Sequence, residues 1–192
     1  ATHIRVELGR YDVLAGTMLA GKVYTGGRTN LRPLVHKMAN EIVFQFTGEA
    51  GFFNSKIALV SDKTGSKEIY IMDVDGQNLL AITRNKSINL SPTWNPQGNA
   101  IAFTSYKKDT PDLYVSDLVK GVTRRVSAYE GGNFSAAFHP KTDQLVLTLA
   151  KAGDSELSPQ DLRGPILGRL TTRRGLAVRP VYNPDGPQIA FV

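Results

Sequence analysis

From residue 56 onward, short apolar runs alternate with turn residues, and the whole pattern returns at a fixed step. Three sets of positions keep a step of 44 residues: Trp94, Phe138 and Tyr182; Pro96, Pro140 and Pro184; and Ile57, Ile101, Leu145 and Ile189. A repeat of about 40 to 50 residues that is built only of strand-like runs is typical of the blades of a β-propeller. The pattern therefore predicts a propeller over most of the chain.

Each repeat predicts four short antiparallel strands, which we label A to D. Strand A covers 90–95, 134–139 and 178–183; strand B covers 56–61, 100–105, 144–149 and 188–192; strand C covers 68–73, 112–117 and 155–161; and strand D ends at 82–83, 126–127 and 170–171. Four such strands with turns between them make one blade. Pro159 predicts that the third copy of strand C is an edge strand or a distorted one.

The first 50 residues follow a different pattern. Apolar and polar residues alternate at the start of 3–13, and a second extended run covers 17–25, so we expect a hairpin. Apolar residues then recur with helical spacing and predict one helix over 30–47. A helix with a single apolar stripe must bury that stripe, here most simply against the hairpin.

These patterns together predict a mostly β chain with two parts. We expect the C-terminal part of a small α/β domain at 1–52 and a partial propeller at 53–192, with blades at 55–86, 87–130 and 131–174 and the start of a fourth at 175–192. The first repeat lacks strand A, and an open ring would leave strand edges unpaired. We therefore expect a fragment at both ends, with the closing strand supplied from further toward the C-terminus.

Composition excludes several classes of protein and site. The chain has 192 residues, no cysteine and a net charge of +6, so disulfides and thiolate metal sites are excluded. No apolar run reaches the roughly 18 residues of a membrane span. Basic residues are dispersed, although the last third is locally basic at Arg163, Arg169, Arg173, Arg174 and Arg179. The repeat aromatics belong to a core rather than a stacking surface, so no nucleic-acid partner is expected.

Several segments together resemble the TolB family of periplasmic propellers. In the propeller part, the resemblance is carried by Lys56–Ser61, Glu68–Gly76, Leu90–Pro96 and Ile101–Ser105. In the preceding part it is carried by Tyr11-Asp12-Val13, Gly21-Lys22, His36–Val43 and Thr47-Gly48-Glu49. Other propellers share the strand motif, whereas its combination with this helix, in this order, is far more specific. The resemblance covers essentially all 192 residues.

The resemblance implies a small α/β domain before a six-bladed propeller, and a function in the periplasm. Proteins of this family belong to the Tol-Pal system, bind the peptidoglycan-associated lipoprotein Pal, and support outer-membrane integrity and cell division. Colicins exploit the same surface, which links the family to protein import and bacteriocin transport. The resemblance also implies a protein that is monomeric when complete and reaches the outer membrane only through its partners. Gly132 stands where many members of the family carry a histidine.

The loops that enter strand A are the candidate partner-binding site. Propellers bind ligands where loops and the innermost strands surround the central channel. We expect the following residues to face a partner: Ile88, Asn89, Leu90, Asn133, Phe134, Val178 and Arg179. Apolar loop residues are the sharper hint, because exposed apolar groups often mark an interface. The alternative for each residue is that it belongs to an ordinary connection between blades and contacts no partner.

The sequence contains no pattern typical of a catalytic site or a metal site. Asp73-Val74-Asp75-Gly76 resembles the start of a calcium loop, but Arg84 stands where such a loop needs its last glutamate, so a turn is expected. His3, His36 and His139 share no metal-ligand spacing. Motifs for a serine nucleophile, a phosphate loop or a dinucleotide site are missing. We expect no enzyme and no cofactor. Two alternatives stay open: the gating propeller of a prolyl-oligopeptidase-type serine hydrolase, and a propeller that binds peptides or glycans.

Overall fold

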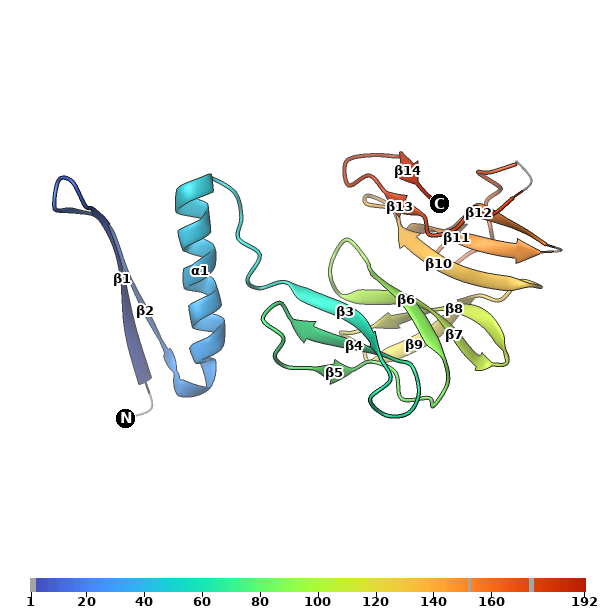
Figure 1. Ribbon diagram of the computed structural model, residues 1–192, viewed down its shortest axis with the longest axis horizontal. Coiled ribbons are helices and arrows are strands. Elements are labelled where there is room, and N and C mark those ends of the chain that lie inside the picture. The colour runs from blue at the N-terminus through green and yellow to red at the C-terminus, as the bar shows by residue number, and fades with distance from the viewer. Residues whose placement is uncertain (1–2, 152, 173–174) are drawn as a thin grey trace. The chain divides into compact units, whose positions relative to one another are not determined.

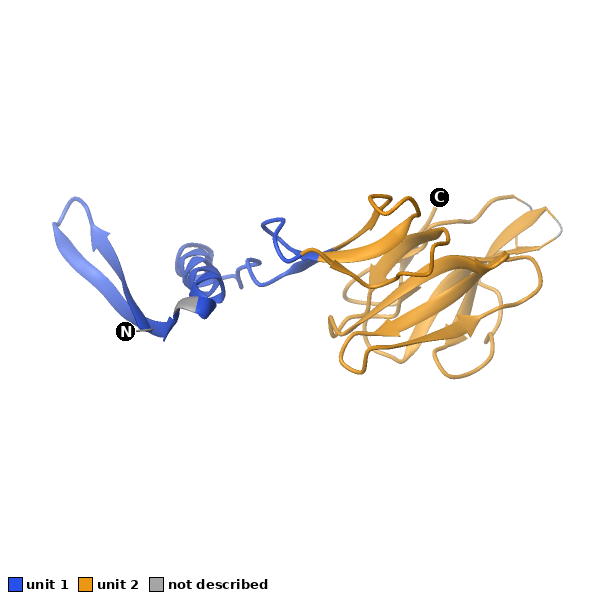
Figure 2. Ribbon diagram, turned by 90° about the horizontal axis from the view of Figure 1, so that it is seen from below, with its two compact units in different colours: residues 1–57, 72–78 blue, residues 58–71, 79–192 orange. Residues whose placement is uncertain are grey.

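The computed structural model of the protein describes residues 3–151, 153–172 and 175–192, which leaves Arg173 and Arg174 of the basic C-terminal third outside the described residues. The chain divides into two compact units, coloured separately in Figure 2. The first comprises Ala1–Ile57 and Met72–Asn78, and the second comprises Ala58–Ile71 and Leu79–Val192. The described residues are mostly β, as predicted, and form sheets of antiparallel strands and one α-helix.

The first unit holds a hairpin followed by a helix (Figure 1). Strand β1 (His3–Asp12) pairs antiparallel with β2 (Thr17–Gly27), and the register shifts at Arg10. A short 3-10 turn, η1 (Arg28–Asn30), leads into α1 (Leu31–Thr47). Gly48 ends the helix in the left-handed conformation and donates its backbone N–H to Phe44 O. This part therefore has the expected order of hairpin and helix.

The apolar stripe of α1 is only partly covered within the first unit. None of the seventeen residues of the helix is buried, and Phe46 remains 75% exposed. In the hairpin, Tyr24 is buried, whereas Val13 and Leu14 at the tip are 91% and 100% exposed. The expected burial of the stripe against the hairpin is therefore incomplete, because two strands cannot cover the whole apolar face of a helix of this length.

The second unit is a series of antiparallel sheets that follow the predicted repeat (Figure 1). Its strands are β3 (Lys56–Ser61), β4 (Glu68–Asp73), β5 (Leu80–Ala81), β6 (Asn89–Trp94), β7 (Ala100–Lys108), β8 (Thr110–Asp117), β9 (Val122–Ser127), β10 (Gly132–Phe138), β11 (Gln144–Lys151), β12 (Asp154–Asp161), β13 (Val181–Tyr182) and β14 (Ile189–Ala190). One sheet has four strands in the order β6-β7-β8-β9, which is a complete blade. The first sheet, β3-β4-β5, lacks an innermost strand, as expected.

The third and fourth repeats are less complete. The described part of the third is a three-stranded sheet in the order β10-β11-β12, in which β12 is the edge strand. Pro159 lies in β12 opposite Val146, and the pairing of β11 with β12 shows no register shift. The proline is thus tolerated at an edge, and the alternative prediction of a distorted strand is wrong. In the fourth repeat, β13 and β14 are two residues long each and pair with one another.

The core lies between neighbouring sheets. Phe138 belongs to a buried cluster with Leu145 and Leu147, while Trp94 and Tyr182 pack against two further clusters of the same kind. The three aromatics at the 44-residue step are thus core residues between blades, as predicted. No helix among the described residues is long and apolar enough to cross a membrane.

Candidate functional site

The connections into strand A and those from strand B to strand C meet at one end of the sheets. Antiparallel pairing brings Asn89, Ser105 and Asp112 into line across β6, β7 and β8, so the loops next to these residues share an end. We call this the loop end and define it as 62–67, 84–90, 106–110, 128–135 and 175–179. It contains every residue that the sequence predicted to face a partner.

Two of the predicted residues, Asn89 and Asn133, are fully buried, with an exposed fraction of 0%. Asn89 Nδ2 donates to Lys67 O at 2.9 Å and to Glu68 Oε2 at 3.0 Å. These bonds tie the loop before β6 to the neighbouring sheet. The side chain of Asn89 therefore holds the loop from inside and does not face solvent.

Asn133 holds the corresponding loop of the next repeat from inside in the same way. Its Oδ1 accepts hydrogen bonds from Ser127 Oγ at 2.8 Å and from the backbone N–H of Tyr129 at 3.0 Å. Its Nδ2 donates to Tyr129 O at 2.9 Å and to Pro111 O at 3.4 Å. Buried polar atoms need such partners, and an amide that satisfies its loop from inside fixes the conformation of that loop.

The other predicted residues reach the surface to different degrees. Ile88 is 46% exposed and Arg179 is exposed, whereas Leu90, Phe134 and Val178 are half-buried. The structure thus brings five of the seven predicted residues to the surface of the loop end. Their contact with a partner stays a prediction.

The residue that follows each of the three half-buried apolar residues has an unusual backbone. Ser91, Ser135 and Arg179 stand 44 residues apart, with φ angles of 52°, 36° and 55°. The register of β6 and β10 shifts at this point, so each strand carries a bulge next to the loop end. Ser135 donates its backbone N–H to Thr104 Oγ1 at 3.2 Å, which ties the bulge to the preceding sheet. The bulges recur because the repeat encodes them.

Sequence reasoning missed a pair of lysines at the loop end. Lys63 Nζ lies 4.7 Å from the centre of the Tyr70 ring, and Lys107 Nζ lies 4.1 Å from the centre of the Tyr114 ring. Both lysines and both tyrosines are 44 residues apart, so the repeat contained the signal. Burial raises the pKa of Tyr114, with a smaller contribution from Asp112, which keeps that phenol neutral.

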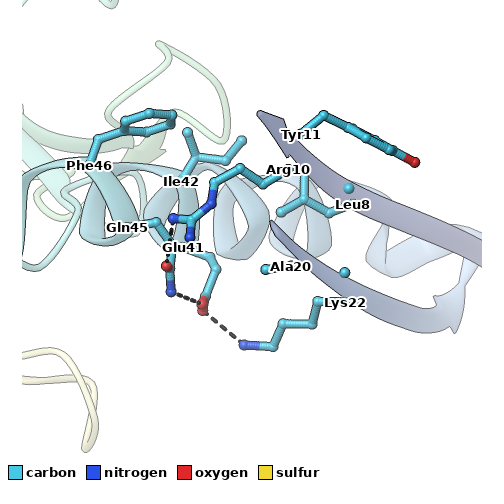
Figure 3. A pocket seen from close by; sticks show the side chains of 11 residues that line it. Leu8, Arg10, Tyr11, Ala20, Lys22, Glu41, Ile42, Gln45 and Phe46 are labelled. Atoms are coloured by element: carbon cyan, nitrogen blue, oxygen red, sulfur yellow. Dashed lines mark hydrogen bonds and ion pairs between the residues drawn. The ribbon is translucent and has the colours of Figure 1, made fainter. Parts of the chain in front are cut away.

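The first unit carries a separate concavity between the hairpin and α1, shown in Figure 3. Its volume is about 420 Å³, and Leu8, Ile42 and Phe46 supply much of its apolar lining. A chain of hydrogen bonds follows its edge: Arg10 Nη1 to Gln45 Oε1 at 3.0 Å, Gln45 Nε2 to Glu41 Oε1 at 3.2 Å, and Lys22 Nζ to Glu41 Oε2 at 2.8 Å. The bond from Lys22 lowers the pKa of Glu41 and keeps the carboxylate charged.

A cluster of charges joins α1 to the turn after β4 within the first unit. Arg32 forms ion pairs with both Asp73 and Asp75, and His36 Nε2 lies 3.1 Å from Asp75 Oδ2. Lys56 Nζ donates to Asp73 Oδ1 at 2.6 Å. The hydrogen bond from Lys56, helped by one from Asn78, lowers the pKa of Asp73 from 3.8 to about 2. This turn, expected from the sequence to be a simple connection, is thus held by charge as well.

The charge cluster makes a testable prediction about pH. Because the pKa of folded Asp73 lies below its ordinary value, the ionised carboxylate stabilises the fold at neutral pH, and this contribution is lost as the pH falls through about 2. We expect the carboxyl carbon of Asp73 to titrate near 2 by NMR. Lys56→Met should move that midpoint up toward 3.8, because the main charged donor is gone. Lys37→Met, a matched change on the exposed side of α1, should leave it in place.

Metal and catalytic chemistry gain no support from this geometry. Among the residues that the structure describes, no three or more histidine and carboxylate side chains gather closely enough to hold a metal ion. His36 contacts Asp75, and the His139 ring lies 5.1 Å from the Tyr182 ring, so each has a structural neighbour. The loop end presents lysine side chains beside exposed and half-buried apolar residues.

The family model and the relatives in sequence agree on one family. The family model described as the TolB beta propeller domain matches residues 43–192. The Tol-Pal system protein TolB of Geobacter sulfurreducens is 44% identical over 98 residues, which are 51% of this chain and 23% of that protein. The protein TolB homolog of Chlorobium chlorochromatii is 37% identical over 182 residues, which are 95% of this chain and 41% of that protein.

A solved structure extends the similarity to the fold. The crystal structure of TolB from Acinetobacter baumannii superposes with a TM-score of 0.86 at 26% identity. The match covers 97% of this chain and 48% of that one, so it includes the hairpin and helix as well as the sheets. The chain thus spans less than half the length of each of these three relatives.

Proposed function

Because the chain belongs to the TolB β-propeller family, we propose that it serves the Tol-Pal system as a non-catalytic binding scaffold in the periplasm. In this proposal the propeller binds the lipoprotein Pal through the loop end and so supports outer-membrane integrity and cell division. Colicins would use the same surface. The first unit would supply a second contact surface for other Tol proteins.

The observation that carries the proposal is the presentation of apolar side chains on rigid loops. Ile88, Leu90, Phe134 and Val178 reach the surface at one end, while buried asparagines hold two of these loops from inside. A binding surface gains affinity when its loops are already fixed in the bound conformation, because less entropy is lost on association. A scaffold that acts by recognition alone needs this kind of preorganised surface.

The main alternative is a propeller that gates a serine hydrolase. It requires an α/β-hydrolase domain elsewhere in the polypeptide, next to a propeller. The match to a solved TolB over 97% of the chain, hairpin and helix included, favours the scaffold. The peptide- or glycan-binding propeller is disfavoured by the same match, because it offers no reason for the hairpin and helix.

Truncation of the half-buried aromatic Phe134 tests the proposed surface. The Phe134 ring packs against Gly132, where an added Cβ would come within 2.0 Å of it, and the side chain is half-buried at the surface of the loop end. Phe134→Ala should weaken binding of Pal by about tenfold, as expected for an aromatic anchor at an interface. Affinity is measured by calorimetry with the Pal protein encoded by the same genome.

The control for this variant is Val119→Ala. Val119 is 79% exposed in the turn between β8 and β9, away from the loop end, and should leave Pal affinity unchanged. Far-UV circular dichroism and thermal unfolding establish that both variants stay folded. Pal binding that is equal for both variants, or absent for the unmodified chain, would contradict the proposed function.

A further inference from the structure

The repeat places a lysine at the same point of three successive blades. Lys63, Lys107 and Lys151 are 44 residues apart; Lys63 follows β3, whereas Lys107 and Lys151 lie in the last residues of β7 and β11. All three are exposed. Because the position recurs with the blades, the ammonium groups belong to one arc of the propeller surface rather than to unrelated loops.

Two of these lysines are held in place by aromatic rings. Tyr70 and Tyr114 are each only 3% exposed, so their rings are fixed by the core. Lys63 and Lys107 lie over these rings at distances typical of a cation–π interaction. A charge fixed in this way loses little side-chain entropy when a partner binds. The third lysine differs, since Ser158 stands at the tyrosine position and Lys151 pairs instead with Glu130 at 3.4 Å.

The loops around the first two lysines are basic overall. The segments 62–67, 84–88 and 106–109 contain six cations, Lys63, Lys67, Arg84, Lys86, Lys107 and Lys108, and two carboxylates, Asp62 and Asp109. Across the described part of the chain, no carboxylate lies within ion-pair distance of any of the six. The turns at the other end of β6–β14 carry Lys120, Lys141 and Arg163 against Asp117, Asp143, Asp161 and Asp185. The positive charge is therefore concentrated at the loop end.

An open cavity lies among these basic loops. Its volume is about 580 Å³, and its lining includes the cations Lys67 and Lys86, the carboxylates Asp62 and Asp109, and the apolar Ile88. The cavity thus holds charges of both signs beside Ile88, one of the residues expected to contact a partner. The excess positive charge of these loops lies outside it, on side chains that include Lys63 and Lys107.

We infer that the loop end docks an acidic surface of a partner protein, with carboxylates against Lys63 and Lys107. The inference rests on the proposed function, since the partner is the Tol-Pal protein bound at this end. A protein fits better than a nucleic acid, because Asp62 and Asp109 interrupt the basic arc and the tyrosine rings are buried rather than free to stack on bases.

Association kinetics with Pal test the acidic docking surface. Steering by complementary charge raises the association rate and makes it fall as salt is added. We expect Lys63→Glu/Lys107→Glu to bind Pal with an association rate about tenfold slower at low salt and a weaker dependence on salt. Lys63→Arg/Lys107→Arg should bind as the unmodified chain does, since it keeps both charges.

A matched control separates local from overall charge. Lys120→Glu/Lys141→Glu changes the net charge by the same amount at the other end of the sheets and should leave the rate nearly unchanged. Equal slowing by both glutamate pairs, or by neither, would overturn the inference. Slowing by the first pair alone supports it.

A second probe distinguishes failure of this inference from failure of the proposed function. Poly-L-glutamate at low salt presents carboxylates without any Pal structure. If the chain does not bind Pal but binds poly-L-glutamate through Lys63 and Lys107, Pal is not the partner. The inference that the loop end binds an acidic surface is then still supported. If the chain binds Pal, and the lysine substitutions change the binding of neither Pal nor poly-L-glutamate, the proposed function is supported and the inference is contradicted. Loss of both binding reactions overturns both.

Discussion

Asn133→Ala is expected to lower the free energy of unfolding by about 2–4 kcal/mol, the effect of leaving several buried polar groups without partners. The alanine removes both acceptor bonds to Ser127 and to the Tyr129 N–H, and both donor bonds to Tyr129 O and Pro111 O. The Tyr129 backbone groups would then lose the partner that the buried amide supplies. Urea unfolding followed by tryptophan fluorescence measures the loss.

The control for this change is an asparagine that solvent reaches. Asn99→Ala removes an exposed side chain that accepts a bond from Asn95 at 2.7 Å, and water can replace that bond, so a loss of only about 0.5 kcal/mol is expected. The folded fraction of Asn133→Ala should bind Pal more weakly than the unmodified chain, because the loop that presents Phe134 is no longer held from inside. Normal stability with lost binding would show instead that this amide contacts the partner, as the sequence first predicted.

The repeat made the sheets and the core predictable. A step of 44 residues locates the aromatic positions, and residues that recur at one point of each blade have to meet the same neighbours. Trp94, Phe138 and Tyr182 were therefore predicted correctly to be core residues between blades. The boundaries of β3 and β4 agree with the predicted strands for the same reason, since short apolar runs between turn residues leave little freedom of register.

The repeat did not reveal which loop residues are buried. Asn89 and Asn133 look like ordinary polar loop residues in the sequence, because an asparagine at the start of a strand is as common on a surface as inside. Their burial depends on the backbone carbonyls of Lys67 and Pro111, which belong to the preceding sheet and are distant in sequence. Only the arrangement in space brings these groups together.

The pair of lysines at the loop end, Lys63 and Lys107, was missed for a different reason. The steps from Lys63 to Lys107 and from Tyr70 to Tyr114 are visible in the sequence, but a lysine in a loop usually belongs to a solvated surface. What distinguishes these two lysines is the position of each ammonium over a ring of its own blade. That contact depends on the path of the loop from strand B to strand C, which the spacing alone does not give.

Gly131→Ala is expected to destabilise the chain by about 3 kcal/mol, because two independent costs add. Gly131 has a φ of +96°, which a residue with a Cβ rarely adopts. The new Cβ would also lie 2.0 Å from Ala150 O in β11, and this neighbour is backbone, so it cannot rotate away. The strands β10 and β11 would have to separate at the very point where β10 enters the sheet. Thermal and urea unfolding measure the loss.

Gly121→Ala separates the two costs. Gly121 has a similar left-handed φ of +66°, but an added Cβ would meet nothing within 4 Å. Its replacement should cost only the conformational part, about 1 kcal/mol, so the difference between the two variants reports the clash with Ala150 alone. Equal losses for the two variants would mean that β10 shifts at no cost. The loop before Asn133 would then be more flexible than its hydrogen bonds indicate. A flexible loop end could not act as the preorganised surface proposed here.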